Sequence, residues 1–349
     1  SGHHLYQHSF PTRRSSDLHD PDAPRLLADI GGTNARFAWQ AGSGAMPEAL
    51  ETLPCADYAT LELAMQAYLE RVQRPRPVLA ALAIANPVHG DRVRMTNHHW
   101  SFSIAELRQR MGLQRLEVLN DFAALALALP DLLPGEKRLL AGCNPAPDAD
   151  VQDGPDRAVG PLALIGAGTG LGVSGLLPLP NGGWLPIAGE GGHVTLAASN
   201  ALEQQVLEAL QQRHGHVSAE RAISGAGLVD LYQALCRAEA RQPHDWGAAE
   251  ISVAALQGHT QARAALELFC AFLGTVAGNL ALTLGARGGL YIGGGIVPKL
   301  GAFFEQSAFR ERFVAKGRFR AYLESIPVWV IVAEQSPALR GAARVLERL

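Results

Sequence analysis

Two glycine-rich turns, each flanked by apolar segments, carry the residue types needed to bind phosphate groups. The first turn places a carboxylate, two glycines, a hydroxyl and an amide in sequence: Asp29, Gly31, Gly32, Thr33 and Asn34. The second turn sets one hydroxyl between glycines: Gly168, Thr169 and Gly170. Backbone N–H groups in such turns approach a phosphate closely because glycine has no Cβ. We expect the two turns to hold the β- and γ-phosphates of a nucleotide, with Asp29 as a ligand of Mg²⁺, directly or through water.

Three other nucleotide-binding motifs are excluded by the sequence. A P-loop ends in Gly-Lys, but none of the three lysines, Lys137, Lys299 and Lys316, follows a glycine. The His-Arg-Asp catalytic loop of protein kinases is absent from the sequence. The spacing Gly-x-Gly-x-x-Gly occurs at 170–175, but the dinucleotide fingerprint must begin a helix, and Pro178 follows almost directly.

A second group of polar residues carries carboxylate, amide and imidazole groups that could bind a ligand through hydrogen bonds. Asn120 and Asp121 begin a helical segment, Glu190 and His193 share a glycine-rich turn, and Glu220 begins a short polar segment. Each also has an ordinary explanation as a helix N-cap, a structural turn or a solvated carboxylate. Glu190 and His193 have the spacing of a metal-binding pair, but no third ligand is nearby. The residue types alone leave these alternatives open.

The segments around these residues alternate between strand and helix patterns. Continuous apolar runs predict buried strands at 25–30, 35–40, 78–85, 116–119, 162–165, 173–177 and 290–292. Helical spacing, with a capping box that begins at Ser103, predicts helices at 61–73, 104–111, 121–129, 201–212, 227–239 and 263–284. A short glycine turn joins antiparallel strands, so the sequence predicts an α/β protein with mixed sheets. The unit of strand, glycine turn and strand occurs twice, which indicates a degenerate internal duplication.

The composition limits the classes of protein that this chain can be. Its 349 residues suggest about two domains. Apolar residues make up 48%, which excludes a disordered chain, and 37 glycines without a three-residue period exclude collagen. A net charge of −3 without any basic run argues against nucleic-acid binding. The four cysteines, at 55, 143, 236 and 270, are far apart, which is typical of reduced thiols in the cytoplasm, where we expect the protein.

Two segments need separate interpretation. Residues 1–24 lack the apolar stretch of a signal peptide, and we interpret them as a leader outside the fold. Residues 268–286 contain no charge and are long enough to span a membrane. We predict instead a buried core helix and no membrane association, because this segment contains Asn279 and several glycines and no second segment accompanies it.

Six motifs in order closely resemble the bacterial glucokinase family, which belongs to the superfamily of hexokinase, actin and Hsp70. The resemblance covers about residues 25–349, and the stretch at 96–100 is also similar to the family. The polar segment at 148–157 departs from it as a longer surface loop. The motifs lie at 29–34, 120–121, 166–172, 189–193, 218–221 and 293–295.

The resemblance implies a two-domain actin-like ATPase fold of the ribonuclease H-like type, with a cleft between the lobes. We expect a small α/β domain at 25–131, a large one at 132–333, and a C-terminal helix at 334–349 that packs back on the small domain. Pro130 and Pro134 interrupt the chain between the two domains, and we place the hinge there. The implied reaction is ATP-dependent, Mg²⁺-dependent phosphorylation of D-glucose at the 6-hydroxyl by a homodimer.

The family's site residues can be carried over by position. Asp121 matches the general base, and a carboxylate at a helix N-terminus is expected to stay ionised near neutral pH. Ser224 and Gly225 are expected near the nucleotide. The other matches are Asn120, Glu190, His193 and Glu220 as sugar ligands, and Gly294 and Gly295 beside the adenosine.

Two alternatives stand beside this hypothesis. One is a related kinase of the repressor/open-reading-frame/kinase group, acting on N-acetylmannosamine or another hexose, but its cysteine-rich zinc motif is missing from 194–200. The other is a non-catalytic sugar-sensing regulator or an actin-like assembly ATPase. A regulator would normally carry a helix-turn-helix segment, which the leader is too short to form, and an assembly ATPase has no use for the sugar ligands.

Overall fold

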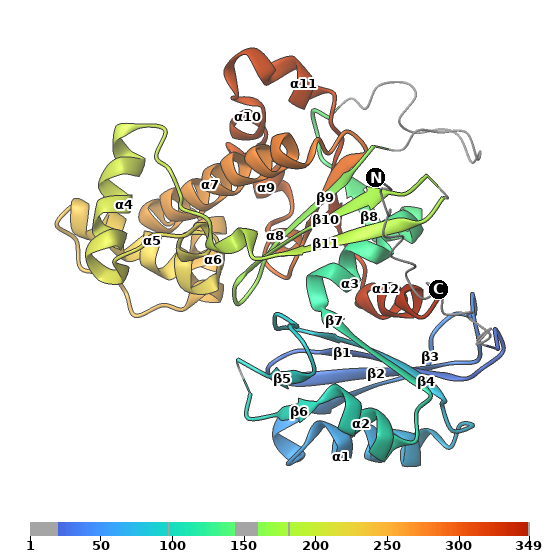
Figure 1. Ribbon diagram of the computed structural model, residues 1–349. Helices are drawn as coiled ribbons and strands as arrows, with labels where there is room; N and C mark the ends of the chain where they lie inside the picture. The colour runs from blue at the N-terminus through green and yellow to red at the C-terminus, as the bar shows by residue number, and fades with distance from the viewer. Residues whose placement is uncertain (1–19, 97, 144–159, 181, 348–349) are drawn as a thin grey trace, which may run out of the picture.

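Two mixed β-sheets, each built around one glycine turn, form the framework of the protein (Figure 1). The computed structural model describes residues 20–96, 98–143, 160–180 and 182–347. The first sheet has the order β3-β2-β1-β4-β7, with β1 (Arg25–Ile30), β2 (Asn34–Gln40), β3 (Glu48–Pro54), β4 (Leu79–Ile84) and β7 (Arg115–Asn120). The second has the order β11-β10-β9-β12-β13-β8, with β8 (Lys137–Leu139), β9 (Leu162–Ala167), β10 (Leu171–Pro178), β11 (Trp184–Gly189), β12 (Gly289–Gly293) and β13 (Val328–Ile331).

The two sheets repeat one arrangement. In each, a glycine turn joins two antiparallel strands, β1 with β2 and β9 with β10. The first strand of each hairpin then pairs in parallel with a later strand, which pairs in parallel with a third: β4 and β7, or β12 and β13. The predicted mixed sheets and internal duplication are therefore confirmed. Four strands of the two sheets were not predicted: the edge strands β3, β11 and β8, and β13, with which β8 pairs in antiparallel orientation.

The strands at the centre of each sheet are buried along their whole length. All six residues of β1 and all six of β9 are buried, as expected for continuous apolar runs covered on both faces. Helix α1 (Leu61–Val72) packs its Tyr68 against Phe37 of the first sheet. Helix α2 (Ile104–Met111) begins where the Ser103 hydroxyl accepts a hydrogen bond from the Glu106 N–H. A short hairpin of β5 (Arg92–Arg94) and β6 (Ser101–Ser103) precedes it.

Most helices belong to the part of the chain around the second sheet. The apolar helix α7 (Thr260–Leu284) is long enough to span a membrane, but 78% of its most apolar stretch is buried inside the protein. Its Gly274 and Gly278 admit close backbone contact, because a Cβ there would lie 2.3 Å and 2.5 Å from the carbonyl oxygens of Phe309 and Phe313. These observations agree with the predicted core helix. Its neighbours are α4 (Ala201–His214), α5 (Gly225–Ala238), α6 (Ala248–Leu256), α8 (Val297–Leu300), α9 (Ala302–Gln306), α10 (Phe309–Val314) and α11 (Arg320–Glu324).

Two helices are exchanged between the sheets and lie between them in Figure 1. Helix α3 (Asp121–Ala128) follows β7 of the first sheet but packs mainly on β10 and β11 of the second. Helix α12 (Ala338–Val345) follows β13 of the second sheet but packs on β1 and β4 of the first. The two helices are equivalent in the duplication, because α3 follows β7 and α12 follows β13, the last parallel strand of each sheet. Each then packs on the sheet of the other repeat.

The N-terminal boundary differs from the prediction. Residues 20–24 pack on the fold, since Ala23 is buried and the Ser43 N–H donates to the Pro21 carbonyl at 2.7 Å. The leader interpretation was therefore wrong for these five residues, whose contacts come from a distant hairpin. The rest of the leader and the polar segment at 148–157 lie outside the described residues.

Candidate active site

The junction of β7 and α3 holds the predicted base and amide. The Asn120 side chain is the N-cap of α3, and its Oδ1 accepts hydrogen bonds from the N–H groups of Phe122 at 2.9 Å and Ala123 at 3.2 Å. Oδ1 of Asp121 accepts a second bond from the Phe122 N–H at 2.9 Å. The capping role of Asn120 is therefore real, and it fixes the start of the helix that carries Asp121.

The Asp121 carboxyl has a pKa raised to about 6. Burial is the largest cause, and the negative charge of Asp29 adds to it, with a smaller contribution from Glu190. The hydrogen bond from the Phe122 N–H lowers the pKa but does not offset these effects. The helix N-terminus was expected to govern this group, and burial governs it instead. The carboxylate is still mostly ionised at pH 7 and is well matched to accepting a proton.

The first glycine turn closes over a buried carboxylate. The Gly31 N–H donates to the Asn34 carbonyl at 2.9 Å, and Asp29, two residues before Gly31, is only 8% exposed. Nη1 of Arg36 lies 3.4 Å from Oδ2 of Asp29. The sequence interpretation missed Arg36, although the signal was present: counting outward from the turn places Asp29 and Arg36 opposite each other across the hairpin.

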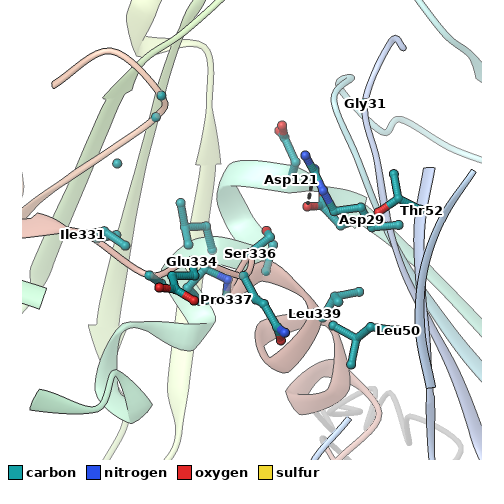
Figure 2. A pocket seen from close by; sticks show the side chains of 18 of the residues that line it. Asp29, Gly31, Leu50, Thr52, Asp121, Ile331, Glu334, Ser336, Pro337 and Leu339 are labelled. Atoms are coloured by element: carbon teal, nitrogen blue, oxygen red, sulfur yellow. Dashed lines mark hydrogen bonds and ion pairs between the residues drawn. The ribbon is translucent and has the colours of Figure 1, made fainter. Parts of the chain in front are cut away.

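A cavity of about 870 Å³ lies between the two lobes at this point. Figure 2 shows Asp29 and Asp121 close together at one side of it, while Glu334 and Ser336 approach from the segment before α12. The lining includes Asp29, Gly31, Arg36, Asp121, Gly294 and Gly295. The other predicted site residues lie outside this lining: Gly32, Thr33, Asn34, Asn120, Gly168, Thr169, Gly170, Glu190, His193 and Glu220.

The second glycine turn is braced by one of the predicted sugar ligands. The Gly168 N–H donates to the Gly170 carbonyl at 2.8 Å, and Oε2 of Glu220 accepts from the Leu171 N–H at 2.8 Å. The Gly225 N–H at the start of α5 donates to the Gly168 carbonyl at 2.9 Å. Glu220 therefore supports the second glycine turn through its carboxylate.

The remaining predicted sugar ligands lie in an adjacent turn. Glu190 and His193 are exposed at a 3-10 turn (Gly191–His193), closed by a bond from the His193 N–H to the Glu190 carbonyl at 3.0 Å. This turn contacts the one that carries Glu220 (Ala219–Arg221). The charge of Glu190 raises the pKa of Asp121, so Glu190 lies within electrostatic range of that carboxyl.

The third glycine turn reaches the end of β9. Gly294 has a φ of 79°, and a Cβ there would lie 2.3 Å from the Ala167 carbonyl oxygen, so only glycine fits. The Ile296 N–H donates to the same carbonyl. Because Ala167 directly precedes Gly168, the Gly293–Gly295 turn and the second glycine turn are adjacent.

Asn86 is a further buried polar residue beside the site, and the sequence interpretation missed it. Its Oδ1 accepts from both the N–H and the hydroxyl of Thr96 at 2.7 Å, and its Nδ2 donates to the Arg94 carbonyl at 2.8 Å. Its own carbonyl accepts from Nδ2 of Asn120 at 3.4 Å. Asn86 thus ties the segment at 94–96 to the side chain of Asn120. Its position directly after the apolar run at 78–85 gave only a weak signal.

The donor set fits a magnesium ion that is bound mainly by its nucleotide. Within the described residues no three His, Cys, Asp or Glu side chains are grouped as a metal cage. Mg²⁺ commonly needs only one or two carboxylates, together with phosphate oxygens and water. Asp29, which faces the cavity beside the first turn, meets that requirement.

Comparison with known proteins agrees with this geometry. The family model described as Glucokinase matches residues 26–349. The glucokinase of Aromatoleum aromaticum is 55% identical over 328 residues, 93% of this chain and 95% of that protein. The glucokinase of Chromobacterium violaceum is 52% identical over 325 residues, 93% and 89% of the two chains. A crystal structure of a glucokinase from an Antarctic psychrotroph has a TM-score of 0.80 at 36% identity and covers 93% of this chain and 99% of its own. With its exchanged helices and duplicated sheets of the actin-like ATPase fold, this chain belongs to the glucokinase family.

Proposed function

We propose that this protein transfers the γ-phosphoryl group of ATP to the 6-hydroxyl of D-glucose, the first step of glycolysis. The observation that carries the proposal is the partly buried Asp121 carboxylate, with a pKa of about 6, on a cavity lined by glycine turns. A hydroxyl is a poor nucleophile until its proton is accepted as the new bond forms, and a carboxylate with this pKa accepts it readily near pH 7.

In the proposed reaction, Asp121 accepts the proton of the 6-hydroxyl while the phosphoryl group passes in line from ATP. Asn120, Glu190, His193 and Glu220 hydrogen-bond the other hydroxyls and orient the sugar. Closure of the lobes, 25–131 with the last helix against 132–333, excludes water so that ATP is not hydrolysed.

The nucleotide is proposed to lie along the three glycine turns. The turns at 31–34 and 168–170 supply N–H donors to the phosphates, and Gly294 and Gly295 leave room for the adenosine. Mg²⁺ held at Asp29 would neutralise charge on the phosphates. Arg36, which pairs with Asp29, places a second positive charge beside the same group. A homodimer is the assembly expected for the family.

The proposal is tested with purified protein, a panel of hexoses and N-acetylmannosamine, and ATP, ADP or polyphosphate as the donor. We expect glucose-dependent release of ADP from ATP and the formation of glucose 6-phosphate. Preference for N-acetylmannosamine would support the related sugar kinase instead. Absence of sugar-dependent ADP release from ATP would contradict the proposal and favour a non-catalytic sugar sensor.

The rate should depend on pH through Asp121. Below about pH 6, kcat/KM for glucose is expected to fall about tenfold per pH unit, because protonation removes the proton acceptor. Initial rates between pH 4.5 and 8 would measure this limb. The residual activity of Asp121→Asn should lack it, and a wild-type rate that stays flat down to pH 5 would show that Asp121 does not govern the reaction.

Glu220 and His193 should differ in which substrate they affect. Glu220→Ala is expected to raise KM about tenfold or more for both glucose and ATP, because the Leu171 N–H of the phosphate turn loses its acceptor. His193→Ala should raise KM for glucose alone. Arg221→Ala, an exposed neighbour, serves as the control. An unchanged KM for ATP in Glu220→Ala would contradict the bracing role of this carboxylate.

A further inference from the structure

The aromatic ring of Phe122 occupies a notch made by two glycines of the second sheet. Gly166 and Gly172 lie directly opposite each other in the β9–β10 hairpin. A Cβ on Gly172 would lie 2.0 Å from Cε2 of the ring, and one on Gly166 would lie 2.8 Å from Cζ. The ring fits only because both positions lack a side chain. These two glycines, which flank the phosphate turn in the sequence, therefore serve a packing role.

The backbone of the same residue holds the base. The Phe122 N–H is the shared donor to Oδ1 of Asn120 and Oδ1 of Asp121, at 2.9 Å in both cases. Because Phe122 is the second residue of α3, the position of its ring in the notch fixes where the helix begins and where this N–H points. The Asp121 carboxylate is positioned by the same contact.

The same end of the hairpin carries the second glycine turn. Strands β9 and β10 lead directly into Gly168–Gly170, so the notch and the turn belong to one rigid hairpin. The base comes from the end of a strand in the first sheet, and the phosphate turn comes from the second sheet. Phe122 is a direct packing contact between them.

We propose that Phe122 is a positioning residue for phosphoryl transfer: seated in the Gly166–Gly172 notch, it holds the Asp121 carboxylate at a fixed place relative to the second phosphate turn. The inference rests on the proposed function, in which Asp121 is the base. Proton transfer and in-line attack need the reacting atoms in a near-attack arrangement, and a displacement of about 1 Å can cost about a hundredfold in rate.

The test uses Gly172→Ala, whose new methyl group occupies the place of the ring. We expect kcat to fall by about tenfold to a hundredfold while KM for glucose and for ATP changes less than about threefold. The acid limb of kcat/KM should also move to lower pH, because a displaced ring admits water to Asp121. In a Phe122→Ala background the same glycine change should cost less than about twofold, since no ring remains to be displaced.

Gly175→Ala on the same strand is the matched control, because its Cβ would meet Leu284 Cδ1 at 2.7 Å and not the ring. It should leave kcat per folded molecule and the acid limb unchanged. If the wild type is active and Gly172→Ala keeps its kcat, the positioning role of Phe122 is overturned while the proposed function stands. A loss of kcat that is explained by unfolded protein would overturn it too. In that case the acid side of the pH profile would not shift, and Gly172→Ala would lower kcat equally in the wild type and in Phe122→Ala. A wild type without sugar-dependent ADP release would overturn the proposed function, and this inference with it.

Discussion

Replacing Asp121 by asparagine is expected to lower kcat by about 10²–10⁴-fold while glucose still binds. The amide oxygen can still accept the hydrogen bond that the Phe122 N–H gives to the carboxylate, so the geometry of the helix start is retained. The amide cannot accept the proton of the 6-hydroxyl. Steady-state kinetics, with glucose affinity measured by calorimetry, would separate the loss of proton transfer from a loss of binding.

The stability of the same variant supplies the control. A carboxyl whose folded-state pKa is raised from 3.8 to about 6 destabilises the folded protein as pH rises between these values, since the folded state holds the proton more tightly than the unfolded state. Above pH 6 this cost reaches on the order of 3 kcal/mol. Asp121→Asn should therefore be more stable than the wild type at pH 7–8 and gain nothing below pH 4.

These two results together identify the role of the residue. A variant that is inactive but more stable has lost chemistry and not structure. Turnover close to that of the wild type would remove Asp121 from the base position. Equal stability of the two proteins at pH 8 would mean that the carboxyl is less buried than the structure indicates.

A second large effect is expected at the crossing of the two exchanged helices. Alanine normally stabilises a helix by about 1 kcal/mol relative to glycine. At Gly341, however, a Cβ would lie 1.7 Å from the carbonyl oxygen of Ala124 and 3.2 Å from the Ala128 backbone nitrogen. A backbone carbonyl cannot turn away as a flexible side chain can, so α3 and α12 must separate. We expect Gly341→Ala to lower the free energy of unfolding by about 3 kcal/mol or more, measured by urea denaturation.

Gly135→Ala is the matched control for this change. No heavy atom lies within 4 Å of a Cβ at Gly135, and its φ is not positive. The substitution there should be neutral or slightly stabilising, through the lower entropy of the unfolded chain. If Gly341→Ala were also neutral, the two helices would have to tolerate a much wider separation than their packing suggests.

The sequence was sufficient where a signal is local. The glycine turns with their flanking apolar runs predicted both hairpins, and the helical spacing predicted α1, α2, α4, α5 and α7 to within a few residues. The buried course of α7 also followed, because its uncharged stretch contains glycines and a polar Asn279. In each case neighbouring residues in the chain determine the structure.

The sequence was insufficient where an effect joins distant segments. The raised pKa of Asp121 depends on burial and on the charge of Asp29, 92 residues earlier. The notch for Phe122 lies on strands that begin some 40 residues later, and Ala23 becomes buried through contacts beyond residue 40. Apolar patterns indicate that such residues pack, but not against what, and so the electrostatics of the site could not be predicted.

The exchange of helices has a consequence for the nascent chain. The face of the first sheet that carries Leu27 and Ala81 is covered by Leu339 and Ala342 of α12. Helix α12 follows the last strand of that sheet by roughly 220 residues, and at about 5–20 residues per second a ribosome needs on the order of 10–40 s to synthesise them. During this interval the sheet presents an apolar face to the cell, where a chaperone that binds unfolded segments could shield it. Completion of the first lobe must therefore wait for the second.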